Sequence, residues 1–134
     1  MCVGGMGHAI SVASGIAINT NKKIFCLDGD GSLTMHMGSL TTSALQKNIV
    51  HILFNNNGHE SVGGQKTSAD SVQFYRLAKI LGYKNTRYCK NKIQLIKDLK
   101  SIDYDQLTIW LNFIHNKFTS VSYTHLRAHE TSLH

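Results

Sequence analysis

Proline is absent from this 134-residue chain, and only 16% of its residues are charged. Without proline, turns depend on glycine and asparagine. The low charge, together with an apolar fraction of 42%, excludes a chain that is disordered along its whole length. No apolar run approaches the roughly 18 residues of a membrane span, and no basic segment with an apolar core opens the chain. We therefore expect one cytoplasmic domain with no membrane partner.

Cysteine is scarce as well, and its spacing excludes two further classes. Cys2, Cys26 and Cys89 form no CxxC pair, so neither a disulfide framework nor a zinc site is predicted. Cys26 lies in an apolar run, which predicts a buried thiol. The net charge of +6 comes from scattered lysines and arginines, which indicates a solvated basic surface and no nucleic-acid partner.

Apolar patterns alternate between helical and strand spacing along most of the chain. They predict helices at residues 8–18, 33–45, 69–81 and 93–99, and strands at residues 23–27, 50–54, 86–89 and 107–114. Such alternation is typical of an α/β fold with a parallel sheet. From Thr119 onwards the pattern is lost. We expect residues 1–118 to form the domain, truncated at its end, and residues 119–134 to be an unstructured tail that is foreign to it.

Two polar motifs follow consecutive predicted strands. Gly29-Asp30-Gly31-Ser32 comes after the first strand, and Asn55-Asn56-Asn57-Gly58 after the second. One parallel crossover brings both motifs to the carboxyl edge of the sheet, where open α/β sheets bind ligands. Carboxylate, amide and carbonyl oxygens suit Mg²⁺, which takes its remaining ligands from phosphates and water. The motifs predict a Mg²⁺-diphosphate site, although GDGS alone is also common as a simple turn.

Three sequence blocks resemble the diphosphate-binding, C-terminal domain of thiamine-diphosphate-dependent enzymes. They are GGMGHAISVASGIAI, CLDGDGSLTMHMGSL and HILFNNNGHESVGGQKT, in this order, and the resemblance covers about residues 3–111. Within that family it is closest to the phosphonopyruvate decarboxylases, with sulfopyruvate decarboxylases next. It implies a three-layer parallel sheet with helices on both faces. It also implies thiamine diphosphate and Mg²⁺ as cofactors, and a small anionic 2-oxo acid that loses CO₂, with 3-phosphonopyruvate giving phosphonoacetaldehyde.

The resemblance also implies roles for individual residues. The cation ligands would be the side chains of Asp30 and Asn56 and the carbonyl of Gly58, and Asn57 is the alternative to Asn56 because three asparagines follow one another. The remaining cofactor contacts would come from Gly4, Met6, Gly29, Gly31 and Ser32. Gly4 would meet the aminopyrimidine, and Met6 would support the bent cofactor. His59 and Glu60 follow the cofactor loop and are the candidate catalytic residues.

In this family a glutamate from a separate pyrimidine-binding domain activates the cofactor. Glu60 and Glu130 are the only glutamates here, and neither stands in that context. The expected partner is therefore a pyrimidine-binding domain or subunit, in a homo- or hetero-oligomer, and the chain alone is expected to be inactive. Lys66 also replaces the proline that is usual in the family. Two alternatives stay open: a sulfopyruvate decarboxylase subunit, and a small basic binding module in which both motifs are simple turns.

Overall fold

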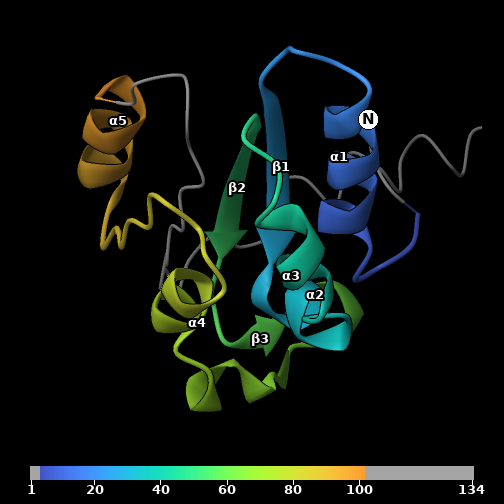
Figure 1. Ribbon diagram of the computed structural model, residues 1–134. Helices are drawn as coiled ribbons and strands as arrows, with labels where there is room; N and C mark the ends of the chain where they lie inside the picture. The colour runs from blue at the N-terminus through green and yellow to red at the C-terminus, as the bar shows by residue number, and fades with distance from the viewer. Residues whose placement is uncertain (1–3, 102–134) are drawn as a thin grey trace, which may run out of the picture.

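Two parallel strands organise the part of the chain that the computed structural model describes, residues 4–101. These strands are β1 (Ile24–Gly29) and β2 (Ile49–Phe54), and both were predicted. Ile24 pairs with Ile49, and Gly29 pairs with Phe54. The strands therefore run side by side and end together, as Figure 1 shows.

Helix α1 (Ala9–Ile18) covers one face of the strand pair and confirms the first predicted helix. Its buried side consists of small or branched residues such as Ile10, Ala13 and Ala17. Alanines at helical spacing allow the helix to approach the sheet closely. These residues join the main apolar core together with side chains from both strands and from the helices that follow β1.

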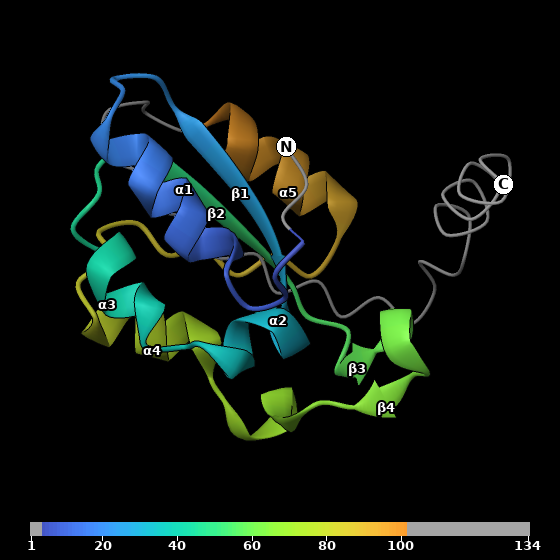
Figure 2. The ribbon, with the colours of Figure 1, turned by 90° about the vertical axis from the view of Figure 1, so that its right-hand side faces the viewer.

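Helix α5 (Lys92–Lys100) lies on the opposite face, and Figure 2 shows α1 and α5 on the two sides of the strands. Leu95 and Leu99 of this helix pack against a second, smaller core of Val50, Ile52 and Cys89. Asn91 caps the helix by accepting a hydrogen bond from the amide of Gln94 at 2.9 Å. The predicted order of helix, sheet and helix is thus confirmed.

The prediction of a single helix at residues 33–45 is wrong. The chain forms two short helices instead, α2 (Asp30–Met35) and α3 (Ser39–Ser43). The break lies at His36, whose φ of −135° and ψ of 49° are not helical. Just after it, the hydroxyl of Ser39 donates to the carbonyl of His36 at 2.8 Å. Local bonds of this kind compete with a continuous helix, which explains the interruption.

A hairpin that the sequence patterns did not predict follows β2. Its strands β3 (Gly58–His59) and β4 (Gln65–Lys66) are antiparallel, and the short 3₁₀ helix η1 (Glu60–Val62) lies between them. The helix predicted at residues 69–81 is then divided into η2 (Ser68–Ser71) and α4 (Phe74–Ile80).

The strand predicted at residues 86–89 is absent from the described part of the chain, so that prediction is wrong. Cys89 is nevertheless buried, because α5 holds it against β2. The strand predicted at residues 107–114 and the tail from residue 119 lie outside the described residues. Across residues 4–101, no helix has the length and apolar character needed to cross a bilayer.

Candidate functional site

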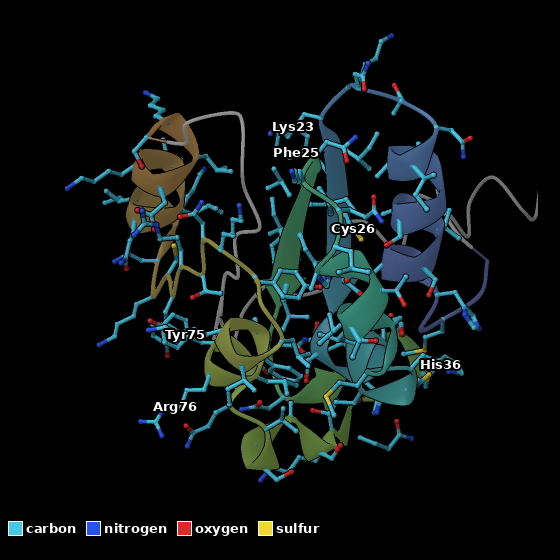
Figure 3. All side chains as sticks on the ribbon, in the orientation of Figure 1. Lys23, Phe25, Cys26, His36, Tyr75 and Arg76 are labelled. Carbon is cyan, nitrogen blue, oxygen red and sulfur yellow. The ribbon has the colours of Figure 1, made fainter. Side chains whose placement is uncertain are left out.

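A cleft of about 1070 Å³ runs beside β1 and reaches the edge where both strands end. Figure 3 labels Phe25 and Cys26 on β1 and Lys23 just before it, and all three line this cleft. Every residue that the sequence singled out for the site also lines it: Gly4, Met6, Gly29, Asp30, Gly31, Ser32, Asn56, Gly58, His59 and Glu60. The fold therefore brings together residues from three separate stretches of the chain, 4–6, 29–32 and 56–60. Asn57, the alternative to Asn56, lines a different hollow of about 300 Å³.

Asp30 is the first residue of α2 and is 2% exposed. Its Oδ2 atom accepts a hydrogen bond of 2.5 Å from the hydroxyl of Thr67. Within residues 4–101, its Oδ1 atom accepts no hydrogen bond. Oδ1 is not among the fully buried side-chain atoms of the described residues that lack a hydrogen-bond partner, so it is reachable from outside. Because Asp30 lines the cleft, this oxygen is available to a cation there.

The asparagine loop is shaped by its own side chains. Oδ1 of Asn55 accepts from the amide of Asn57, and Oδ1 of Asn56 accepts from the amide of Gly58, both at 3.1 Å. Asn57 has a positive φ of 57°, a conformation that asparagine tolerates better than most residues. These turns leave Asn56 and Gly58 in the wall of the cleft that also contains Asp30.

The donors available at this edge are hard oxygens. No group of three His, Cys, Asp or Glu side chains suited to a metal occurs in the described range. The amide oxygen of Asn56 carries two lone pairs, so its bond to Gly58 leaves one for another partner. One carboxylate, one amide oxygen and one backbone carbonyl fit Mg²⁺, which needs few protein ligands when a phosphate supplies others. The residues present therefore fit the predicted metal.

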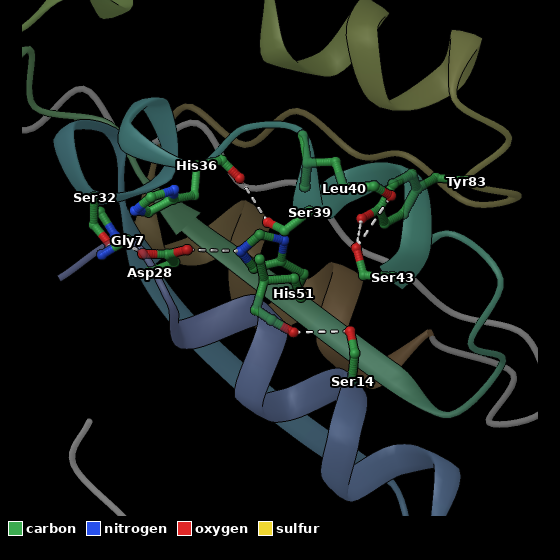
Figure 4. A network of polar contacts seen from close by, with 12 residues as sticks. Gly7, Ser14, Asp28, Ser32, His36, Ser39, Leu40, Ser43, His51 and Tyr83 are labelled. Atoms are coloured by element: carbon green, nitrogen blue, oxygen red, sulfur yellow. Dashed lines mark hydrogen bonds and ion pairs between the residues drawn. The ribbon is translucent and has the colours of Figure 1, made fainter. Parts of the chain in front are cut away.

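The glycine-rich loop before α1 is attached to the start of α2. The amide of Gly7 donates to the hydroxyl of Ser32 at 3.0 Å, a contact drawn in Figure 4. Gly7 has a φ of +89°, and a Cβ atom there would lie 2.7 Å from the ring of His36. Only glycine fits this conformation and this space. The bond from Gly7 fixes the loop that carries Gly4 and Met6 beside the cleft.

His59 lies directly over Gly31. A side chain at position 31 would overlap the imidazole of His59, so the close approach depends on glycine. His59 is half-buried, whereas Glu60 is exposed at the start of η1. The hairpin therefore places both candidate catalytic residues in the cleft wall, with His59 nearer to the Gly-Asp-Gly turn.

A buried acid-base pair lies just behind these loops. Oδ2 of Asp28 is 3.5 Å from Nε2 of His51, and both side chains are almost fully buried (Figure 4). Asp28 belongs to β1 and His51 to β2, so the pair joins the two strands. The other oxygen of Asp28 accepts from the amide of Gly29 at 2.9 Å. This hydrogen bond to Gly29 links the Asp28 carboxylate to the backbone at the start of the Gly-Asp-Gly turn.

Sequence reasoning missed Thr67. This residue ends the third sequence block, but no role was predicted for it, because it lies 37 positions from Asp30 in the sequence. Only the hairpin brings it to the carboxylate, because β4 ends immediately before it.

Comparisons with known proteins agree with this geometry. Residues 1–106 match the family described as "Thiamine pyrophosphate enzyme, C-terminal TPP binding domain". Over 89 residues, or 65% of the chain, the sequence is 39% identical to phosphonopyruvate decarboxylase of Streptomyces hygroscopicus, of which it covers 22%. Over 88 residues, or 64% of the chain, it is 34% identical to the beta subunit of sulfopyruvate decarboxylase from Methanothermobacter thermautotrophicus, of which it covers 48%.

A solved structure shares the fold. The thiamine diphosphate-dependent 4-hydroxybenzoylformate decarboxylase of Rhodococcus jostii RHA1 superposes with a TM-score of 0.70 at 20% sequence identity. The match covers 87% of this chain and 24% of that one. The chain therefore spans about a quarter or less of the length of these two longer decarboxylases.

Proposed function

Because the chain belongs to the thiamine pyrophosphate enzymes, as their C-terminal TPP-binding domain, we propose that it is the Mg²⁺- and diphosphate-binding part of a 2-oxo-acid decarboxylase. The observation that carries the proposal is the single cleft at the carboxyl edge of β1 and β2. Residues from the Gly-Asp-Gly turn, the asparagine loop, the glycine-rich loop and the hairpin all line it. Ligands of α/β sheets bind at this edge.

Asp30 and Asn56 hold the cation through their side chains in this proposal, and Gly58 holds it through its carbonyl. Asp30 is the anionic member and the most deeply buried of the three. Asn56 is preferred to Asn57 because it shares the cleft with Asp30, whereas Asn57 lines another hollow.

The rest of the cofactor is held by neighbouring groups. Gly29 and Gly31 allow the backbone to approach the diphosphate. The hydroxyl of Ser32 accepts from Gly7, so its own proton remains available for a phosphate oxygen. Gly4 and Met6 contact the aminopyrimidine end. When bound, thiamine diphosphate supplies the nucleophilic carbon and the electron sink for decarboxylation. The residues of this chain that hold the diphosphate position the cofactor and form no covalent bond with it.

The substrate we propose is 3-phosphonopyruvate. The 39% identity to a phosphonopyruvate decarboxylase supports this choice, and the placement of His59 and Glu60 in the cleft wall gives two residues that can contact substrate. Sulfopyruvate is the second candidate, because a beta subunit of sulfopyruvate decarboxylase is 34% identical. Both substrates are small anionic 2-oxo acids, so the chemistry at the 2-oxo carbon is the same.

A second domain or subunit completes the enzyme in this proposal. The printed name of the methanogen relative describes a beta subunit, which supports an assembly from separate chains. Glu60 is the only glutamate within residues 4–101, and it lies on the hairpin, so the activating glutamate comes from the partner.

Cys26 and Cys89 are both free thiols, which fits a reducing, cytoplasmic location.

Calorimetric titration of thiamine diphosphate into the 134-residue chain, with Mg²⁺ or with EDTA, tests the cofactor assignment. We expect binding only with Mg²⁺, and at least a 100-fold loss of affinity in Asp30→Ala, because this variant removes the one charged ligand. Asp70→Asn is the matched control, since it also removes a carboxylate but lies outside the cleft, in a surface pair with Lys66. Equal affinity in Asp30→Ala and in the control would reject the metal assignment. A chain that binds no cofactor at all would favour a binding module.

Activity is tested by adding a pyrimidine-binding domain from a close relative. We expect no turnover by the chain alone, and release of phosphonoacetaldehyde from phosphonopyruvate once the second domain is present. Turnover of sulfopyruvate alone would move the assignment to the second candidate, and turnover by the isolated chain would disprove the need for a partner.

A further inference from the structure

Thr67 contacts both loops of the cation site. It follows β4, caps η2 and is 6% exposed. Its hydroxyl donates to Oδ2 of Asp30 at 2.5 Å, and its backbone amide donates to the carbonyl of Asn57 at 3.2 Å. The residue just after the hairpin is therefore bonded to the Gly-Asp-Gly turn and to the asparagine loop.

The direction of the hydroxyl bond is fixed by a third contact. The amide of Ala69 lies 3.3 Å from the same hydroxyl oxygen. An amide can only donate, so the oxygen of Thr67 accepts there and its single proton is left for Asp30. Oδ2 of Asp30 is thereby committed as an acceptor within the protein. Oδ1, which accepts no hydrogen bond from the described residues, is the oxygen left for a ligand.

The methyl group of Thr67 restricts the same turn from its other side. A Cβ atom built on Gly31 would lie 3.1 Å from Cγ2 of Thr67, so the methyl lies close to the backbone of the residue after Asp30. The side chain thus fixes the carboxylate through its hydroxyl and crowds the neighbouring backbone through its methyl. A carboxylate held in this way cannot rotate without breaking a buried hydrogen bond.

We propose that Thr67 is a positioning residue that orients Asp30 so that Oδ1 faces the Mg²⁺ of the cofactor, and that it sets the spacing between the two ligand loops. The inference rests on the proposed function, because it assumes that Asp30 binds the cation. It adds a role for the β3–β4 hairpin. Besides placing His59 and Glu60, the hairpin brings Thr67 to Asp30 and to the asparagine loop.

Two substitutions at position 67 test the inference. Thr67→Val keeps the shape and removes the hydroxyl, and Thr67→Ser keeps the hydroxyl. At saturating thiamine diphosphate, we expect Thr67→Val to raise the Mg²⁺ concentration for half-maximal binding by about 10-fold or more, the scale of one hydrogen bond to a charged group. Thr67→Ser should stay within about 3-fold of the unmodified chain. Without Mg²⁺, none of the three proteins should bind the cofactor.

Asn91→Ala is the control for a general loss of stability. It removes a side-chain helix cap, as Thr67→Val does at η2, but it lies at α5, outside the cleft. We expect it to leave the Mg²⁺ requirement unchanged. Any of three results would overturn the positioning role. They are an equal shift in Asn91→Ala, an unchanged Mg²⁺ requirement in Thr67→Val, and a Mg²⁺ requirement in Thr67→Ser as high as in Thr67→Val.

The failure of the inference and the failure of the proposed function give different results. If Asp30→Ala loses Mg²⁺-dependent binding while Thr67→Val keeps it, only the role of Thr67 is wrong. If Asp30→Ala binds as the unmodified chain does, the metal assignment itself is wrong, and the role of Thr67 is overturned with it.

Discussion

Strands β1 and β2 are paired along their whole length, yet their surroundings differ. Five of the six residues in β2 are buried, whereas only Cys26 and Asp28 are buried in β1. Leu53 in β2 is 1% exposed, and Leu27 in β1 is 61% exposed. The difference arises because α1 and α5 enclose β2 from opposite faces, while one face of β1 borders the open cleft.

This contrast separates stability from binding within one small unit. β2 contributes side chains to both apolar cores, so it gains packing energy on both of its faces. β1 contributes its accessible face and its carboxyl end to the cleft. The candidate site thus lies where a well-packed strand meets an open one, and the packed strand fixes the geometry of the other through their shared hydrogen bonds.

The largest expected effect is a difference in the free energy of unfolding between a core variant in β2 and a matched variant in β1. Leu53→Ala is expected to lower the free energy of unfolding by about 2–5 kcal/mol, because it leaves a cavity in the core. Leu27→Ala should change it by about 0.5 kcal/mol or less, since the side chain is already in contact with solvent. Urea unfolding followed by circular dichroism measures both. Equal losses would show that β1 is as deeply packed as β2.

An intermediate effect should distinguish neighbouring asparagines after β2. Asn56→Ala is expected to weaken Mg²⁺-dependent binding of thiamine diphosphate about 10-fold, since it removes a ligand. Asn57→Gly should leave it within about 3-fold, because glycine accepts the positive φ of this position. Calorimetry with each variant measures the difference. The reverse ranking would assign the cation to Asn57 and to the smaller hollow.

A smaller effect concerns the buried thiol of β1. Burial, with a further contribution from the Asp28 carboxylate, raises the pKa of Cys26 from 9.0 to about 12. Between about pH 9 and 12 the unfolded chain loses this proton and the folded chain keeps it, so stability falls as the pH rises. The loss from this residue is about 1.4 kcal/mol by pH 10.

Comparison with Cys26→Ala isolates that contribution. The variant also leaves a cavity, but the cavity costs the same at every pH. Urea unfolding at pH 8 and pH 10 should therefore show a smaller decline for Cys26→Ala than for the unmodified chain. Equal declines would mean that the thiol is solvated and that β1 is open on both faces.

The parts of the fold that could be predicted from sequence have strong local patterns. Continuous apolar runs predicted β1 and β2, and small apolar residues at helical spacing predicted α1. Because strand order then fixes which ends meet, the placement of Asp30 and Asn56 at one edge also followed from sequence. The parallel pairing of neighbouring strands was enough to bring the two motifs together.

The parts that could not be predicted depend on contacts between distant residues. The break at His36 divides a segment whose apolar spacing is helical throughout. Thr86–Cys89 has apolar and aromatic residues typical of a strand, but Cys89 is buried through α5 without strand pairing. Thr67 belongs to the same group, since its bond to Asp30 exists only after the hairpin has formed. No local pattern encodes such a contact.

The register of β1 and β2 has a consequence for the order of folding. Ile24 opposite Ile49 and Gly29 opposite Phe54 define one parallel crossover unit, and its paired residues lie closer in the sequence than Asp30 and Thr67, which are 37 positions apart. Contacts of short sequence separation form faster than distant ones. The two loops that carry Asp30 and Asn56 would therefore approach one another early, as a nucleus. The hydrogen bond from Thr67 to Asp30 joins residues that lie further apart in the chain, so it would form after the two loops have met.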